Sequence, residues 1–296
     1  MMRQAFRAGI FVSALVCAAA ASAGAEPDWL AVLRTKAQRG DAKAQLRLGE
    51  VYELGAGSIA PDAPLAFAWY RRAAEGGDPE AQSALGAMYA FGRGTAQSHT
   101  EAVRWYRLAA DRGDARGQNN LGEQLARGLG VTTSYHEAVV WYRRSAEQGY
   151  PVAMANLGFM YEHGRGVAQD SAEAVKWFRK AADLGDPQGE YNLALAYKDG
   201  AGVTKDPAQA IEWCRRAAEH GFPRAAYAIG VSYRDGFVVA KNAVDALAWL
   251  IVATSRAGEV EAREFAPIRD AAARTLNPVE IAAAQTRAQS LLELPR

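Results

Sequence analysis

The chain has 296 residues and half of them are apolar, so it is long enough to bury an extended hydrophobic core. Lysine plus arginine (34) nearly balance aspartate plus glutamate (33), which leaves a formal net charge of +1. This balance excludes the basic footprint that is typical of nucleic-acid-binding proteins, so we expect no nucleic-acid partner.

The start of the chain, residues 1–25, has the pattern of a secretory signal peptide. Arg3 and Arg7 provide positive charge, and an alanine-rich apolar stretch follows them. Small residues suited to cleavage come next, which predicts cleavage after Ala23 or Ala25. Because the apolar stretch is too short to span a membrane, we expect no transmembrane segment and a periplasmic or secreted protein.

Residues 26–39 have the pattern of a single helix. Trp29, Leu30 and Leu33 fall on one face of that helix. We interpret this segment as an N-terminal capping helix, because the open end of a repeat array would otherwise expose its core.

Tryptophans recur every 36 residues through the middle of the chain. A strict period of this length indicates a repeat array, in which one supersecondary element is copied and stacked. The tryptophans are Trp69, Trp105, Trp141, Trp177, Trp213 and Trp249. The period divides residues 40–258 into six repeats, at about 40–76, 77–112, 113–148, 149–184, 185–220 and 221–258.

Each repeat contains two helical patterns joined by a glycine-rich loop. Ala81, Leu85 and Met88 form an apolar stripe on the first helix, and the tryptophan belongs to a similar stripe on the second. Gly86 lies within the first helix, where glycine costs about 1 kcal/mol relative to alanine. We expect this cost to be offset by close approach of the facing helix, with no side chain between the two.

Three motifs recur at this period, and the third repeat shows them clearly. They are Leu121-Gly122 in the first helix, Gly128-Leu129-Gly130-Val131 in the loop and Trp141-Tyr142 in the second helix. In this combination residues 40–258 resemble the Sel1-like repeat family, which is related to the tetratricopeptide repeats. The resemblance implies an all-α fold: a right-handed α-solenoid of six Sel1-like helical hairpins with N- and C-terminal capping helices.

Residues 259–296 follow the last repeat and predict a C-terminal helical cap. Two helices are expected, at Glu259–Leu276 and Val279–Leu292. Asn277 and Glu280 flank Pro278 in the arrangement of a capping box, which marks the start of the second helix.

The sequence contains no recognisable catalytic or cofactor motif. Its four histidines occupy different repeat positions and form no metal-binding pair, so we expect no metal and no cofactor. The Gly-x-Gly loops follow no strand and lack the lysine of a phosphate-binding loop. Cys214 takes a position that is aromatic in four other repeats, which favours a packed core thiol over a nucleophile. We therefore expect a protein that is not an enzyme.

Basic pairs recur on the second helices, as in Arg71-Arg72 and Arg143-Arg144. A ridge that binds a polyanion is one interpretation of these pairs. Because an acid such as Glu75 or Glu147 follows each pair's first member by four residues, a solvated face of weak ion pairs is the other.

In tetratricopeptide-like solenoids the first helices line a concave groove, and the residue before Leu-Gly points into it. The resemblance thus places Asn120, Asn156 and Asn192 in a row along such a groove. A carboxamide offers two donors and an acceptor, so such a row is able to bind the backbone of an extended peptide. Asparagines that are merely hydrated are the alternative.

Apolar and aromatic side chains are expected beside the asparagines towards the C-terminal end of the array. They are Phe159, Tyr191, Leu195 and Tyr227. Aromatic anchors usually carry much of the binding energy of an interface, so we expect a peptide or partner helix to dock across repeats three to six. Replacing Asn156, Asn192 and Tyr191 by alanine is expected to abolish capture of the partner.

The resemblance implies a protein-interaction scaffold or adaptor, present as a monomer or weak oligomer. Periplasmic members of the family restrain envelope signalling or support exopolysaccharide-related assembly. A β-lactam-binding or β-lactam-hydrolysing protein is an alternative, but such members carry a disulfide in each repeat, and here Cys214 would be the one cysteine left after cleavage. A glycan or peptidoglycan binder is another, and it requires exposed aromatic side chains.

Overall fold

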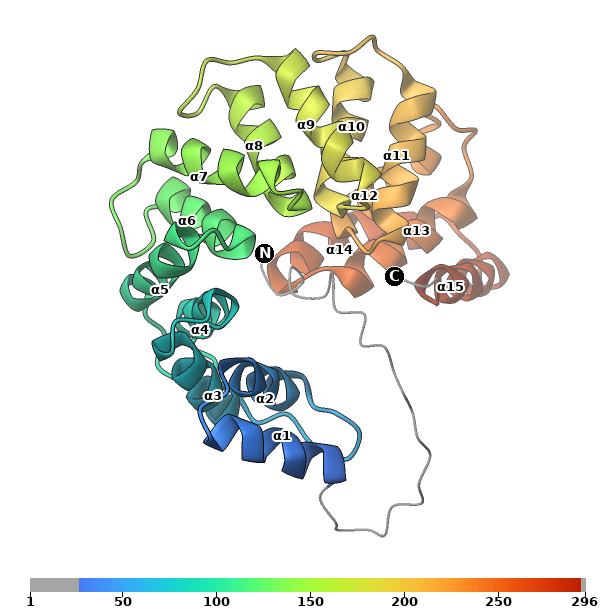
Figure 1. Cartoon of the computed structure of the whole chain (residues 1–296). Helices are drawn as coiled ribbons and strands as arrows, with labels where there is room; N and C mark the ends of the chain where they lie inside the picture. Colours follow the sequence, from blue (N-terminus) through green and yellow to red (C-terminus); the bar gives the residue numbers. More distant parts are fainter. Residues whose placement is uncertain (1–26, 294–296) are drawn as a thin grey trace. The chain divides into compact units, whose positions relative to one another are not determined.

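The computed structural model describes residues 27–293, and this part of the chain contains fifteen α-helices (Figure 1). The predicted signal peptide lies outside the described residues. The described chain divides into two compact parts. We call residues 27–153 with 165–168 the N-terminal unit, and residues 154–164 with 169–293 the C-terminal unit.

The N-terminal unit consists of one lone helix followed by three helical hairpins. Its core contains Leu48, Leu85 and Tyr70, which are almost fully buried. The helices are α1 (Asp28–Gln38), α2 (Ala42–Leu54), α3 (Ala63–Glu75), α4 (Pro79–Phe91), α5 (His99–Asp111), α6 (Ala115–Arg127) and α7 (Tyr135–Glu147). The helix α8 (Pro151–His163) begins in this unit and continues in the C-terminal unit.

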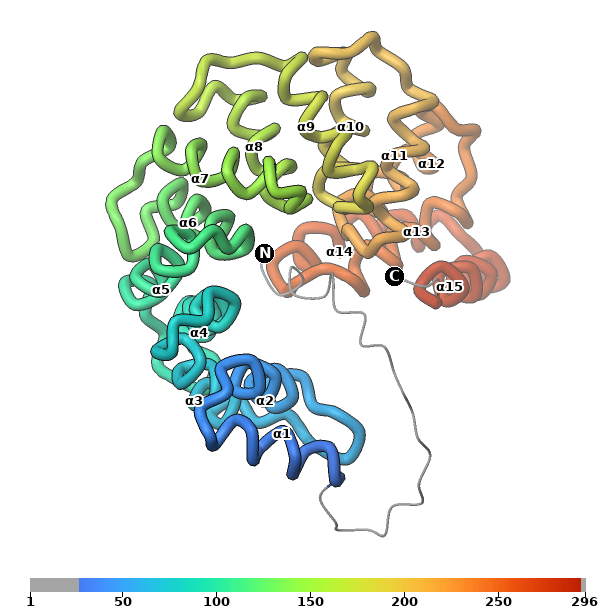
Figure 2. Tube along the Cα trace, viewed as in Figure 1, coloured from blue at the N-terminus to red at the C-terminus, as the bar shows by residue number. Residues whose placement is uncertain are grey.

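The C-terminal unit continues the hairpins and ends in two additional helices. Figure 2 traces the chain as it passes from α10 to α11, two helices that pack along each other. The helices are α9 (Ser171–Asp183), α10 (Pro187–Asp199), α11 (Pro207–Glu219), α12 (Pro223–Asp235), α13 (Ala243–Arg256), α14 (Glu259–Ala273) and α15 (Pro278–Leu292). Both α14 and α15 pack on α13, and Phe265 and Ala284 belong to the same core as Leu250. The helix expected to end at Leu276 ends instead at Ala273.

Most of the helices begin at a polar side chain that caps their first turn. The Asp78 carboxylate accepts a hydrogen bond from the Ala81 amide at 2.9 Å. The capping box predicted at Asn277 and Glu280 is present. Such caps satisfy amide groups that have no partner within the helix, and each typically contributes about 1 kcal/mol. In α12 the capping position is taken by Phe222, which makes no side-chain cap.

In the first four repeats, the glycine within the first helix makes room for a ring. A Cβ placed on Gly86 would lie 2.6 Å from the Tyr106 ring. A Cβ placed on Gly122 would lie 2.9 Å from the Tyr142 ring. The close approach predicted from the sequence is present, but the expectation that no side chain lies between the helices is wrong. The ring of the second helix fills the space that a Cβ would occupy.

The repeating tryptophans are core residues, and basic side chains stack on them. Trp69, Trp105, Trp141 and Trp249 are buried, whereas Trp177 and Trp213 are half-buried. A basic group three residues further on lies over the indole in four repeats: Arg72 at 4.6 Å, Arg144 at 4.7 Å, Lys180 at 4.0 Å and Arg216 at 4.4 Å from the ring centroid. These stacked cations are the second members of the predicted basic pairs.

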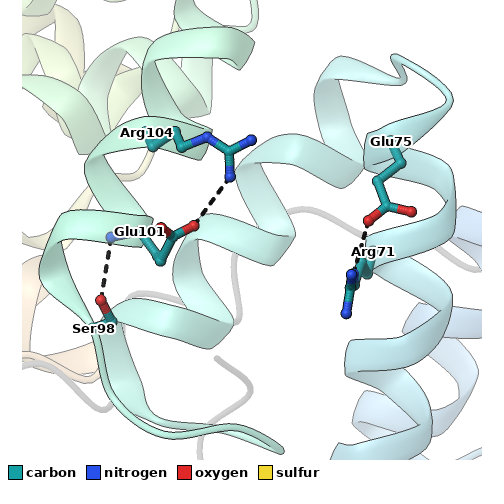
Figure 3. A network of polar contacts seen from close by, with 5 residues as sticks. All are labelled: Arg71, Glu75, Ser98, Glu101 and Arg104. Carbon is teal, nitrogen blue, oxygen red and sulfur yellow. Dashed lines mark hydrogen bonds and ion pairs between the residues drawn. The ribbon is translucent and has the colours of Figure 1, made fainter.

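The first members of the basic pairs bind other side chains. Figure 3 shows the predicted pair of Arg71 with Glu75, at 2.8 Å. On α5, which has no basic pair, Arg104 pairs with Glu101, whose own amide is capped by Ser98 (Figure 3). Three further arginines have partners at other spacings than the predicted four residues: Arg107 pairs with Glu137, Arg179 donates to Tyr197 and Arg215 pairs with Glu212. Basic groups held by acids and rings in this way favour a solvated face over a ridge for polyanions.

Candidate functional site

The side chains predicted to bind a partner lie on the first helices of consecutive hairpins. In the C-terminal unit, Phe159 is on α8, Tyr191 and Leu195 are on α10, and Tyr227 is on α12. We call these four residues the first-helix patch. Tyr191 and Leu195 are four residues apart and therefore share one face of α10.

The first-helix patch is partly open to solvent. Phe159 is 36% exposed, and the other three side chains of the patch are half-buried. Phe178 on the neighbouring second helix is by contrast 0% exposed. The patch therefore offers apolar surface that the unit itself leaves uncovered.

Each ring of the patch is backed by a second ring. Tyr191 lies against Phe222, with 5.0 Å between the ring centroids. Tyr227 stacks on Phe265 at 4.6 Å. Aromatic pairs at these separations are favourable and restrict the motion of both rings. The patch is consequently a set of rings in defined positions.

The second rings were not predicted from the sequence. Phe222 stands where Asp186 caps the preceding first helix, and Phe265 belongs to α14, beyond the repeats. The sequence offers one signal for Phe222: it replaces the capping aspartate that most of the other repeats have at this position. Phe159 is paired with His163 on its own helix, at 4.1 Å between ring centroids.

The predicted asparagines are engaged by their own chain. Asn192 is only 7% exposed, and its carboxamide oxygen accepts a hydrogen bond from Gln188 at 2.9 Å. Asn156 is half-buried on α8. In the N-terminal unit, Asn120 accepts from Asn119 at 3.2 Å and also bonds the Tyr106 hydroxyl. The asparagines thus orient neighbouring side chains, and part of their hydrogen-bonding capacity is used for that purpose.

The titratable groups near the patch are not arranged for nucleophilic chemistry. Burial raises the pKa of the Cys214 thiol to about 12, and burial also raises the pKa of Tyr191. A thiol with such a pKa is almost entirely protonated at neutral pH and is a poor nucleophile. Within residues 27–293, no cluster of three or more His, Cys, Asp or Glu side chains is placed to hold a metal ion.

None of the helices between residues 27 and 293 combines the length and the apolar character that crossing a bilayer requires.

Consecutive helical hairpins of one repeating pattern define an α-solenoid, a class whose extended surfaces serve protein recognition. The sequence model of the Sel1 repeat matches six consecutive segments that cover most of the chain. The chain therefore belongs to the Sel1 repeat family, whose members are generally protein-interaction scaffolds. The matched segments are residues 42–78, 79–114, 115–150, 151–186, 187–222 and 223–256.

Solved structures of bacterial proteins share this fold. A Sel1 repeat protein from Oxalobacter formigenes is 30% identical, with a TM-score of 0.68, over 77% of this chain and 97% of that one. A protective antigen present in uropathogenic Escherichia coli strains is 28% identical, with a TM-score of 0.52, over 90% of this chain and 64% of the antigen. Comparison with curated proteins gives no match.

Proposed function

We propose that this protein is a non-enzymatic adaptor of the cell envelope that binds a peptide or helix of a partner protein at the first-helix patch. Envelope signalling and exopolysaccharide-related assembly are the processes in which we place it. The observation that carries the proposal is the set of rings on α8, α10 and α12, which are partly exposed and held by neighbouring rings.

The arrangement of the rings favours binding over a purely structural role. Large aromatic side chains at the centre of an interface contribute most of its binding energy. Because Tyr191 and Tyr227 are already fixed against Phe222 and Phe265, little conformational freedom would be lost when a partner docks. The half-buried Leu195 adds apolar surface beside Tyr191 on the same helix.

The envelope assignment rests on a different observation. The pattern of residues 1–25 is that of a signal peptide for secretion. Detection of a mature protein that begins at Gly24 or Glu26 in the periplasmic or extracellular fraction would support this part of the proposal. A full-length protein retained in the cytoplasm would contradict it, without bearing on the patch.

Alanine substitutions at two positions of the first-helix patch test the binding site. Phe159→Ala together with Leu195→Ala removes apolar surface without cutting the hydrogen bond of the buried Asn192. We expect capture of the partner in cells to fall at least about tenfold, the effect of losing one interface hot spot. Capture is measured by cross-linking followed by mass spectrometry.

Phe237→Ala is the matched control, because Phe237 is also a phenylalanine of the C-terminal unit, is 51% exposed and lies in the loop between α12 and α13. The control should capture the partner as the wild type does. Equal capture by the double variant and the control, with unchanged thermal stability in both, would show that the partner binds elsewhere.

A further inference from the structure

One buried position on the first helices joins neighbouring hairpins. In the first three repeats this position is a glutamine whose amide donates to a carbonyl on the preceding helix. The bonds are Gln45 to Ala37 at 3.0 Å, Gln82 to Ala74 at 3.1 Å and Gln118 to Ala110 at 3.2 Å. Each bond spans eight residues, and each therefore ties the start of a hairpin to the end of the helix before it.

In the fifth repeat the same position holds Glu190, which is 0% exposed. The residue eight positions earlier is Ala182, whose backbone carbonyl corresponds to the acceptors of the glutamines. An ionised carboxylate has no hydrogen to donate to that carbonyl. Glu190 therefore occupies the position of a donor while carrying a group that, when charged, is only an acceptor.

The two carboxylate oxygens of Glu190 have unequal partners. Oε2 lies 2.8 Å from Nδ1 of His220. Oε1 is buried without a hydrogen bond, although Nε of Arg216 approaches it to 3.4 Å as an ion pair. Oε2 thus has a close polar partner, whereas Oε1 has only the longer ion pair to offset the loss of its hydration.

The charges around Glu190 come from its own helix and from α11. Arg216 and His220 on the α11 side favour the carboxylate, while Glu219 disfavours it. Asp186 caps the same helix and adds a further negative charge. The helix α9 contacts the adjacent Gly189 through Ala181 and Ala182, which carry no charge.

Burial is the main influence on the pKa of Glu190 and on that of Asp186, the cap of α10. It raises the pKa of Glu190 above its ordinary value, and His220 and Arg216 oppose this effect only in part. It raises the pKa of Asp186 from 3.8 to about 6. The folded state therefore holds protons on these acids at pH values where the unfolded chain has lost them.

We propose that Glu190 makes the junction of α9 and α10 sensitive to protonation. A neutral Glu190 has an O–H to donate, and the equivalent position of the glutamines in the first three repeats assigns the Ala182 carbonyl as its acceptor. When the proton is lost to solvent, this bond is lost with it, and the buried carboxylate is held by His220 and Arg216 alone.

The direction of the pH dependence follows from the raised pKa values. An acid that is more easily protonated in the folded state stabilises the fold fully below its unfolded pKa, and this contribution disappears as the pH rises through the folded pKa. For Asp186 the contribution to stability is lost between about pH 4 and about pH 6. The contribution of Glu190 is also lost as the pH rises, because its pKa is raised in the folded state too. The junction is predicted to loosen as an acidic compartment becomes neutral.

Thermal unfolding of the full chain at pH 4 and pH 8 tests the proposal with Glu190→Gln. We expect the variant and the wild type to melt together at pH 4, where both donate to Ala182. At pH 8 we expect the variant to melt about 2–4 °C higher, because only its amide still donates. Hydrogen exchange of the α9 and α10 amides should show the same difference at pH 8, which locates the effect at the junction.

Two further variants serve as controls. Glu212→Gln removes an exposed acid from α11 and should follow the wild type at both pH values. Glu190→Met introduces the residue that the fourth repeat has at this position, Met154. This variant adds no hydrogen-bond donor, and it should also remove the pH dependence of hydrogen exchange at the junction. A constant difference between Glu190→Gln and the wild type across the pH range would overturn the proposal, as would exchange at the junction that is independent of pH.

Discussion

Gly158 and Phe178 fit together across the fourth hairpin: a Cβ placed on Gly158 would lie 2.6 Å from the Phe178 ring. In the fifth hairpin the same two positions hold Ala194 and Cys214, and both are buried in one core. A larger residue on the first helix thus accompanies a smaller residue on the second. The fifth repeat departs from the pattern at both positions together, so the added methyl group of Ala194 fills part of the space that the smaller Cys214 leaves between the helices.

Replacing Gly158 by alanine should therefore destabilise the protein. Because the new methyl group and the ring would compete for one space, we expect a loss of about 1–3 kcal/mol, the usual cost of overpacking a core. Chemical denaturation monitored by circular dichroism measures this loss.

Combining Gly158→Ala with Phe178→Cys reproduces the pair of the fifth hairpin. The double variant should be more stable than the sum of the two single changes predicts, with a coupling energy of about 1 kcal/mol or more. Simple additivity would show that the two positions do not compensate each other.

Val238 is a second departure from the repeat. It has a φ of 70°, and within the described residues it is the sole non-glycine residue with a positive φ. A β-branched residue in this region is strained by about 1–2 kcal/mol. A glycine variant relieves this strain, but part of the gain is offset because glycine gives the unfolded chain more conformational freedom. We expect Val238→Gly to raise the free energy of unfolding by about 0.5–1 kcal/mol. The opposite change at the matching position, Gly202→Val, should be strongly destabilising, because its side chain would collide with the Ser171 carbonyl.

Denaturation curves of the two variants decide this prediction. The reverse order of stability, with Val238→Gly below the wild type, would mean that the Val238 side chain contributes packing that outweighs its backbone strain.

Cys214 is expected to be unreactive in the folded protein. Burial raises its pKa to about 12, so the reactive thiolate is scarce at pH 8. Treatment with iodoacetamide at pH 8 should leave the Cys214 peptide unmodified in the native protein and modify it completely in denaturant, as read by mass spectrometry. Rapid modification under native conditions would show that the fifth hairpin opens readily. Because the folded pKa is the higher one, the thiol's contribution to stability should be lost as the pH rises from about 9 to about 12.

The architecture could be predicted because it depends on a period. Local sequence patterns indicated the helices: the 36-residue spacing of the tryptophans, the glycine loops and the capping box at Asn277. The structure confirms the helical hairpins that these patterns indicate. Periodicity shows which face of a helix is buried. It does not show which side chain fills a given space, which is why the ring beneath Gly86 was missed.

The candidate site was predictable only in outline. The positions of Phe159, Tyr191 and Tyr227 follow from the repeat, but their partners Phe222 and Phe265 lie where the repeat pattern fails or has ended. The engagement of Asn192 by Gln188 depends on side-chain conformation, which a pattern does not contain. Contacts made by irregular positions require the three-dimensional structure.

Site-specific photo-cross-linking in living cells tests the binding proposal most directly. A photoreactive phenylalanine analogue is placed at Leu195, within the first-helix patch, and in a second strain at Phe237, outside it. We predict that irradiation yields one discrete protein adduct from position 195, that the adduct is lost when Phe159→Ala is added, and that position 237 yields none. Adducts of the same partner from both positions, or from position 237 alone, would contradict the assignment of the patch as the binding surface.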